Sequence, residues 1–471
     1  EEEKNNIFNK VHLGSKVYLR GSFSEPLDNT VPNTFNYKRY LYNKKIYYIF
    51  DISEYKIIGS NNLIYKLKDN LFKKIYNSEN SDYYLAFILG DKALLSSDIY
   101  NAYQKNGISH LLAISGMHIN MLVLLISKII KSEKKEFVVT SSFLLLYLFL
   151  TGLTASIMRA ILFYILKKIN KLKNLRYSNM HILILSAYII LFIDPFMIYD
   201  LGFIYSFVVC FGIIYYNNYI KGNYFIKLLK LSIITFLFSL PVTALVNFEI
   251  NLLSILINII FVPWVSLFLY PFTLISFIIP FLNPILSFFI TITNDLNIFF
   301  GKFSLLINIP KMPIIFVALF YLILLTKKKK NIYFLPLIVV ICKLLPLLDF
   351  NYYVYYLDVG QGDSSILLSP HNKETIMIDT GGKVEYKIDD WKKKIYHLSD
   401  NTIKFLKSKG ITSFSYMIIT HGDADHAKES LNIIENINVK NVVLNSGNTN
   451  YLEKEIISSK INITKKYNLK Y

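Results

Sequence analysis

Residues 416–426 read Tyr-Met-Ile-Ile-Thr-His-Gly-Asp-Ala-Asp-His, an apolar run followed at once by a polar loop. The branched and aromatic residues of the run are typical of a β-strand. The loop holds four metal-type ligands within six residues: His421, Asp423, Asp425 and His426. Imidazole and carboxylate groups bind divalent cations, and a sharp loop can direct them at two metals, as in two-metal hydrolysis. The alternative is a polar turn that caps a helix, which four such residues in six disfavour.

Two upstream stretches place an acidic residue and glycines directly after a strand-like run. They are Asp358-Val-Gly-Gln-Gly-Asp363 and Asp379-Thr-Gly-Gly382. Glycine lets backbone segments approach closely, and an aspartate at such a turn can hold a metal-bound water or orient a ligand histidine. The strand-like runs alternate with a helical pattern, so we expect an α/β domain over residues 349–471.

The composition excludes two broad classes of protein. Hydrophobic residues make up 53% and charged residues 18% of the 471 residues. A soluble globular chain has about 25% charged residues, and a disordered chain has low hydrophobicity. Cys210 and Cys342 each lie in an apolar run, which predicts no disulfide. Apolar runs recur between residues 110 and 348, and at about 20 residues per span we expect about eight to ten transmembrane helices.

Four prolines, Pro241, Pro263, Pro271 and Pro280, interrupt these runs. Broken helices at membrane depth are tolerated inside protein or beside a water-filled cavity, which favours a transport path. A simple proline kink is the alternative at each position.

The distribution of lysine and arginine predicts the orientation. Four connections are basic, whereas two connections on the opposite side contain no Lys or Arg. The basic connections are residues 128–136, 167–176, 217–230 and 327–330, and the others are residues 194–200 and 248–254. Cytoplasmic loops carry an excess of Lys and Arg, so we expect both flanking soluble regions to face the outside of the cell. The net charge of +18 is compatible with a polyanionic substrate.

Residues 1–61 contain two strand-like runs, at 11–21 and 46–52, and residues 62–109 continue with a helical pattern. We expect a small β domain followed by a helical connector. Aromatic and basic side chains are mixed within the β region, and such mixtures suit single-stranded nucleic acid. Ordinary barrel and surface residues are the alternative for any one position.

In their order along the chain, the three C-terminal signals resemble those of the metallo-β-lactamase-fold hydrolases. In the membrane region, Gly107-Ile-Ser-His-Leu-Leu-Ala-Ile-Ser-Gly-Met-His-Ile119 resembles the signature of the ComEC family, the bacterial DNA-uptake channels of natural competence. Further stretches resemble the same family, so that the resemblance extends over nearly the whole chain. They are Phe35–Leu41, Thr151–Ala160, Asp194–Pro195 with Asp200–Phe203, and Asn258 with Val262–Pro263.

The resemblance implies an N-terminal OB-like domain at residues 1–61, a helical connector at 62–109, a polytopic transmembrane domain at 110–348 and an incomplete metallo-β-lactamase-like domain at 349–471. It implies transport of one DNA strand across the bacterial cytoplasmic membrane during natural transformation, with the C-terminal domain as a metal-dependent nuclease. The implied partners are DNA, the membrane, an outer DNA receptor and a cytoplasmic helicase-like motor. A separate motor is expected because the chain contains no Walker-type nucleotide-binding motif.

The resemblance also assigns site residues. It makes His421, Asp423, Asp425 and His426 the ligands of a divalent metal, zinc or manganese, and Asp379 and Asp425 the catalytic carboxylates. In the membrane region it singles out His110, Ser115, Gly116, His118, Arg159 and Asp194 as channel residues. The alternative for Ser115 and Gly116 is close helix packing, and for Arg159 it is an internal ion pair.

One departure from the wider lactamase fold affects the metal site. That fold uses further ligands downstream, including a bridging aspartate and a histidine, but none of the eight histidines follows His426. In addition, Ala427-Lys-Glu429 replaces a glycine-rich continuation. We therefore expect this chain to lack a full two-metal site and to be a fragment of a longer protein. Two other functions stay open: a membrane-anchored metallohydrolase acting on another extracellular substrate, and a channel with an inactive lactamase-like domain.

Overall fold

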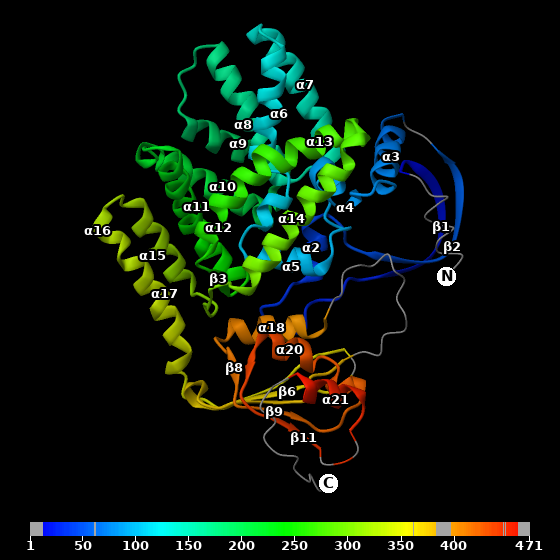
Figure 1. Cartoon of the computed structure of the whole chain (residues 1–471), viewed down its shortest axis with the longest axis vertical. Helices are drawn as coiled ribbons and strands as arrows, with labels where there is room; N and C mark the ends of the chain where they lie inside the picture. The colour runs from blue at the N-terminus through cyan, green and yellow to red at the C-terminus, as the bar shows by residue number, and fades with distance from the viewer. Residues whose placement is uncertain are drawn as a thin grey trace. The chain divides into compact units, whose positions relative to one another are not determined.

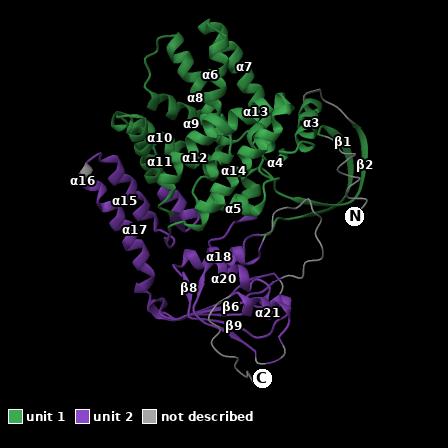
Figure 2. Cartoon of the chain, in the orientation of Figure 1, with its two compact units in different colours: residues 1–27, 38–239, 251–305 green, residues 28–37, 240–250, 306–471 purple. Residues whose placement is uncertain are grey.

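The computed structural model describes residues 13–60, 63–360, 362–382, 397–445, 447 and 449–459 (Figure 1). The chain divides into two compact units, each built from separate stretches of sequence (Figure 2). Unit 1 comprises residues 1–27, 38–239 and 251–305, and unit 2 comprises residues 28–37, 240–250 and 306–471. Neither unit is a continuous stretch of chain. The domain boundaries proposed from the sequence stay predictions.

Unit 1 begins with a two-stranded ribbon. Strands β1 (Ser15–Ser24) and β2 (Ile49–Ser60) pair antiparallel, with Ser15 opposite Ser60 and Ser24 opposite Ile49. Most side chains of β1 are exposed, as expected of an isolated pair of strands, which buries little apolar surface. The strands agree with the β character expected of this region. An OB-like barrel is not confirmed among the described residues and stays a prediction.

The helices that follow build the core of unit 1. Large side chains such as Tyr83, Phe87 and Tyr270 are fully buried there, drawn from residues 75–112 and 257–290. The helices are α2 (Tyr37–Asn43), α3 (Leu63–Tyr76), α4 (Ser81–Tyr84), α5 (Ser97–Lys105), α6 (Gly116–Ile129), α7 (Glu133–Thr151), α8 (Ala155–Leu172), α9 (Asn179–Ile193), α10 (Leu201–Tyr215), α11 (Tyr224–Val246), α12 (Ser254–Trp264), α13 (Tyr270–Ile278) and α14 (Asn283–Lys302). The end of α11 belongs to unit 2.

Four helical segments of the described chain are long and apolar enough to cross a membrane, by length and composition. They are Tyr224–Val246, Ser254–Ile278, Pro280–Lys302 and Lys330–Leu348. Four shorter apolar helices of 10–17 residues accompany them: α6, α9, α10 and α15 (Ile314–Leu325). These helices support a membrane protein, and the total of about eight to ten transmembrane helices stays a prediction.

The four prolines lie within helices or at their starts. Pro241 is inside α11, and Pro263 is inside α12, which continues directly into the π-helical segment Val265–Leu269. A wider turn of this kind relieves the ring clash and the lost hydrogen bond that proline causes inside a helix. Pro271 lies in the first turn of α13 and Pro280 opens a short 3-10 turn, positions at which the missing N–H costs little. Pro241 and Pro263 therefore lie inside helices, and the choice between a simple kink and a transport path stays a prediction.

Unit 2 contains a mixed five-stranded sheet in the order β11-β9-β7-β6-β5. The strands are β5 (Tyr353–Tyr356), β6 (Ser365–Leu368), β7 (Thr375–Ile378), β9 (Tyr416–Ile419) and β11 (Val442–Leu444). β5, β6 and β7 run antiparallel to one another, whereas β7, β9 and β11 are parallel. Figure 1 shows α18 (Ser399–Ser408) and α20 (Ser430–Asn436) together over this sheet. The arrangement confirms the expected α/β domain.

The remaining elements of unit 2 are short strands and helices. The short strands are β3 (Glu249–Asn251) with β4 (Leu306–Asn308), and β8 (Ser413–Phe414) with β10 (Asn438–Val439). The helices are α15, α16 (Lys329–Ile332), α17 (Phe334–Leu344), α19 (Ala424–Ala427) and α21 (Tyr451–Ser458).

Residues 28–37 are an integral part of unit 2. Val31 is buried in the same apolar cluster as Met377 and Met417 of the sheet. Asn33 Nδ2 donates a hydrogen bond to Ser408 Oγ at 3.0 Å, at the end of α18. The sheet therefore completes its core with a segment that comes from near the start of the chain.

Candidate metal centre

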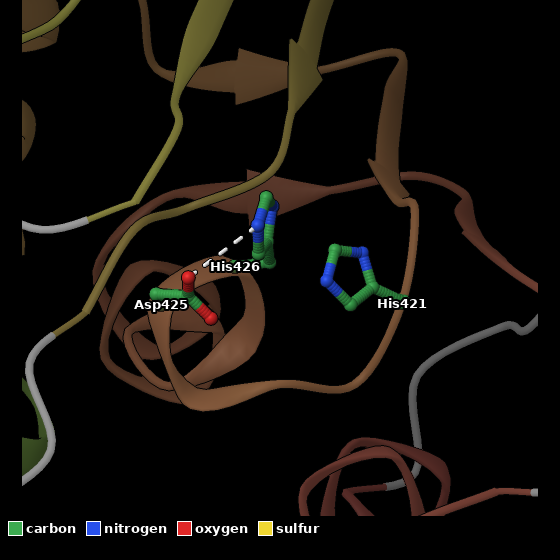
Figure 3. Close-up of side chains that lie close together, drawn as sticks. All are labelled: His421, Asp425 and His426. Atoms are coloured by element: carbon green, nitrogen blue, oxygen red, sulfur yellow. Dashed lines mark ion pairs between the residues drawn. The ribbon is translucent and has the colours of Figure 1, made fainter.

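The metal-type residues lie on the loop between β9 and α19. One ligand atom from each of His421, Asp425 and His426 lies within 4.8 Å of the others, and the two imidazole centroids are 3.9 Å apart (Figure 3). Two imidazoles and one carboxylate are the three protein ligands of an open catalytic site, in which water takes the next position. The donors that the structure brings together therefore fit one divalent cation.

Asp379 is the buried acid next to this cluster. It follows β7 directly and is 4% exposed. Its Oδ1 accepts a hydrogen bond from the N–H of Thr420 at 2.8 Å, and its Oδ2 lies 2.9 Å from Nδ1 of His426. Because a carboxylate only accepts, Nδ1 of His426 carries the proton and Nε2 offers its lone pair. Asp379, expected as a catalytic carboxylate, is thus placed to orient a cation ligand.

Thr420 extends the same arrangement to His421. Thr420 Oγ1 donates to Asp379 Oδ2 at 2.7 Å and lies 3.0 Å from Nδ1 of His421. A hydroxyl has one proton, so it accepts from the Nδ1–H of His421 and leaves Nε2 of that ring free. One buried carboxylate therefore fixes the tautomer of both histidines. Sequence reasoning did not single out Thr420, whose signal is its place between β9 and the motif.

Two glycines allow the upstream turns to touch the motif loop. A Cβ at Gly362 would clash with the carbonyl oxygen of Asp425, and one at Gly382 would clash with that of Ala424. Both glycines have positive φ, +85° and +154°, which L side chains rarely adopt. The close approach that the sequence predicted for these turns is therefore present at both.

Asp423 and Asp425 differ in their placement. The side chain of Asp423 is 74% exposed, and its Oδ2 lies 3.6 Å from Nε2 of His421. Asp425 is half-exposed, with Oδ2 3.7 Å from Nε2 of His426, the pair that the dashed line marks in Figure 3. Of the four expected ligands, the described structure brings three together and leaves Asp423 outside that group.

Glu429, in the stretch Ala427-Lys-Glu429 that replaces the glycine-rich continuation, has a structural role. Its buried carboxylate accepts a hydrogen bond from Ser399 Oγ at 2.5 Å, at the start of α18. Its backbone N–H donates to the carbonyl oxygen of Gly381 at 3.4 Å. Glu429 therefore ties the turn after Asp379 to α18. Sequence reasoning treated this position only as a departure from the fold.

Asn450 contacts the loop between β9 and α19 that carries the metal-type residues. Its Nδ2 donates to the carbonyl oxygen of Gly422, and the residue also caps α21 in a capping box with Glu453. Sequence reasoning missed this contact. The Asn-x-x-Glu pattern is a helix-start signal, but it does not reveal the partner loop.

Three channel candidates lie at the start of α6. Ser115 is the N-cap of this helix, and its N–H donates to Nδ1 of His118 at 3.0 Å, which closes a capping box. The buried ring of His118 lies 4.3 Å, centroid to centroid, from that of Tyr270. Gly116 is the first residue of the helix. His110 lies apart, on the 3-10 turn Ser109–Leu112, and is exposed.

Asp194 and Asp200 flank the 3-10 turn Pro195–Tyr199. Each accepts a hydrogen bond from a backbone N–H of the helical turn that it caps, at 3.2 and 3.0 Å respectively. Asp194 Oδ1 also lies 3.3 Å from Lys45 Nζ, and Asp200 Oδ2 lies 3.6 Å from Lys44 Nζ. In the structure, Asp194 thus caps a turn and pairs with a lysine.

Arg159 lies one turn into α8 and is 9% exposed. Its Nε donates to Ser206 Oγ at 2.6 Å. The described chain places no carboxylate within 4 Å of its guanidinium, so the internal ion pair considered for this residue has no acidic partner there.

The helical unit and the cluster of three metal-type ligands define a membrane protein that carries a metallo-β-lactamase-type domain. The model of the Competence protein family matches residues 87–327, about half of the chain, and that of the Metallo-beta-lactamase superfamily matches residues 357–455. The chain belongs to the competence protein family. The second match implies metal binding, in agreement with the donor set.

Curated relatives extend the similarity. ComE operon protein 3 of Bacillus subtilis is 27% identical over 477 residues, which cover 93% of this chain and 61% of the relative. Uncharacterized protein MG316 of Mycoplasma genitalium is 28% identical over 56% of this chain and 70% of the relative. This chain thus spans about three fifths of the length of the Bacillus protein. No solved structure matches it.

Proposed function

We propose that this chain acts in DNA uptake and passes one DNA strand across the bacterial cytoplasmic membrane during natural transformation. The observation that carries the proposal is the match of residues 87–327, which contain most of the apolar helices, to the Competence protein family. Similarity to ComE operon protein 3 over 93% of the chain supports it. The apolar helices supply the membrane passage, and a cytoplasmic helicase-like motor and an outer DNA receptor are its partners.

The metal centre of unit 2 is proposed to cleave phosphodiester bonds of the strand that is not transported. His421, Asp425 and His426 are the residues that would hold the cation, zinc or manganese, because their donor atoms converge. A bound cation supplies charge stabilisation and a water of lowered pKa. Asp379 and Thr420 keep both Nε2 atoms free for it. Both soluble regions face outwards in this proposal, and the N-terminal region binds DNA there.

The test uses a deletion strain of the source organism, complemented with the full-length gene and supplied with end-labelled duplex DNA. We expect label in the DNase-resistant fraction only when the gene is present. Equal entry with and without the gene, in a host shown to take up DNA, contradicts the transport function.

The preorganised donor set also supports a second candidate, a membrane-anchored hydrolase of another outer substrate. Asp425→Ala separates the possibilities, because it removes a ligand without touching the helical unit. If the wild-type protein supports degradation of the strand that is not transported and Asp425→Ala does not, the metal centre acts on DNA. Unchanged uptake and degradation in Asp425→Ala indicates a channel whose lactamase-like domain is inactive.

A further inference from the structure

Arg159 differs from the other charged groups placed around the helices of unit 1. Asp194, Asp200 and Glu136 each have a lysine partner, Lys45, Lys44 and Lys168 respectively, at 3.3, 3.6 and 2.6 Å. The buried guanidinium of Arg159 has one hydrogen bond, from Nε to Ser206 Oγ. Within the described chain, its two Nη groups have neither an acceptor nor a counter-ion.

The terminal nitrogens of Arg159 are directed at the start of α6. A Cβ placed on Gly116 would lie 2.7 Å from Nη2 of Arg159. Gly116 is the first residue of this 14-residue helix. The N–H groups of a first helical turn have no acceptor within the helix, and they carry a partial positive charge. Ser115 and His118 cap one another, which leaves the N–H groups of Gly116 and Met117 at this end.

The positive charge of Arg159 and the positive end of α6 thus lie close together. Cations are favourable at the C-terminus of a helix and unfavourable at its N-terminus, so the helix gives Arg159 no compensation. An anion between the guanidinium and the helix start removes the conflict. The planar guanidinium, fixed through Nε by Ser206, matches two oxygens of a phosphate with its remaining donors.

We propose that Arg159 and the N-terminus of α6 form an anion site that binds the monoanionic phosphate of a phosphodiester. Gly116 lets the guanidinium come close to the start of α6, Ser206 orients it, and the first N–H groups of α6 complete the donor set. The inference rests on the proposed function in one respect, that a nucleic-acid strand brings this phosphate to the site. A phospholipid headgroup carries the same group and is the other source.

The test measures binding of a fluorescein-labelled oligothymidylate of twelve nucleotides to the full chain in dodecyl maltoside micelles, which contain no phosphate. EDTA is present, so that the strand is not cleaved. We expect Arg159→Gln to weaken binding about tenfold at low salt, the size of a charge-assisted hydrogen bond pair. The slope of log affinity against log salt should fall by about 0.7, one phosphate contact. Arg176→Gln removes an equal charge from an exposed loop and should leave the slope unchanged.

Gly116→Ala is the second variant and keeps every charge. Its methyl group occupies the space beside Nη2, so it should weaken binding like Arg159→Gln, and it keeps the test decisive where Arg159→Gln does not fold. Wild-type affinity and slope in Gly116→Ala, or in a folded Arg159→Gln, overturns the anion site.

The lipid source has its own arm. Addition of phosphatidylglycerol to the micelles should not change oligothymidylate binding if the site takes the strand. If the site takes a headgroup, phosphatidylglycerol should compete with oligothymidylate in the wild-type protein and not in Gly116→Ala. The anion site is then confirmed, with a lipid as its phosphate source. Equal DNA uptake with and without the gene, in a host shown to take up DNA, contradicts the proposed function alone. If the gene is required for DNA uptake but Arg159→Gln and Gly116→Ala bind oligothymidylate as the wild-type protein does, only this inference is contradicted.

Discussion

Nζ of Lys407 lies 2.7 Å from Oε2 of Glu249, and this ion pair joins the last turn of α18 to β3 within unit 2. The two side chains are 17% and 24% exposed. The carbonyl oxygen of Lys407 also accepts a hydrogen bond from Asn308 Nδ2 at 2.9 Å, and that of Ser408 accepts one from the N–H of Lys311 at 2.9 Å. The end of α18 is therefore the point where several separate segments of unit 2 attach.

A double-mutant cycle tests this ion pair. We expect Glu249→Gln and Lys407→Met to destabilise the protein singly and to show a coupling free energy of about 1 kcal/mol, because the pair is mostly shielded from water. Thermal unfolding of the four purified proteins measures it. The exposed pair Glu133–Lys171, with side chains 52% and 65% exposed, is the control and should show almost none. Equal coupling in both cycles contradicts the role of burial.

Asp379→Asn tests how the histidines are held. The amide cannot accept from all the donors that now reach the carboxylate, so the tautomers of His421 and His426 are no longer fixed. We expect zinc affinity to fall about 10- to 100-fold, measured by competition with a chromophoric chelator. Asp358→Asn is the matched control, since among the described residues Asp358 accepts only a local bond, from the N–H of Gly360 in its own turn. The same loss in both variants speaks against a specific role of Asp379.

Thr420→Val tests the link from Asp379 to His421. The valine has a similar shape and no hydroxyl, so Nδ1 of His421 loses its partner, and we expect zinc affinity to fall severalfold. Thr420→Ser retains the hydroxyl and should bind zinc almost as wild type does. If serine and valine give the same affinity in the chelator assay, the hydroxyl does not orient the ring.

Gly362→Ala tests the close approach of the first turn to the motif loop. Gly362 and Gly360 have similar positive φ, +85° and +82°, so alanine meets the same backbone strain of about 1–2 kcal/mol at either. Only at Gly362 does the new Cβ meet a backbone oxygen, that of Asp425; at Gly360 the nearest atom, a Leu398 methyl carbon, is 4.0 Å away. We expect Gly362→Ala alone to abolish zinc binding, and similar zinc affinities in the two variants would contradict the contact.

Asp349 gives a pH-dependent prediction. Its carboxylate accepts hydrogen bonds from the N–H of Asn351 at 3.1 Å and from Oη of Tyr353 at 2.9 Å, and these lower its pKa, the backbone bond first. A lowered pKa stabilises the folded state above the ordinary pKa of the group, and this stabilisation is lost as the pH falls through the lowered value. Urea unfolding should therefore show a stability difference between wild type and Asp349→Asn at neutral pH. The difference should shrink below about pH 4, and a constant difference down to pH 2 contradicts the prediction.

The sequence predicted the parts of the fold that local patterns determine. The alternation of strands and helices after residue 349 indicated the α/β sheet, and the spacing of His421, Asp425 and His426 indicated their convergence, since they lie on one sharp loop. Thr420 and Glu429 escaped notice because their roles depend on partners, Asp379 and Ser399, that approach only in the folded sheet. Distant pairing of this kind leaves no periodic signal in the sequence.

The same reason explains what the sequence could not assign in unit 1. Spacing alone does not distinguish a helix cap from a channel residue, and the structure places Asp194 and Ser115 at caps through contacts with neighbouring turns. It equally could not show that Arg159 lacks an acidic partner among the described residues. The close approach of Arg159 to Gly116 is visible only once α6 and α8 are packed.

The contribution of residues 28–37 to unit 2 has a consequence for how the protein is made. Asn33 and its partner Ser408 are 375 residues apart. At about 5–20 residues per second, roughly 20–75 s of synthesis separate them. During that time Val31 has no apolar core to enter, while the intervening helices are being delivered to the bilayer. The sheet therefore closes only after the intervening helices have been made, around a segment translated 375 residues earlier.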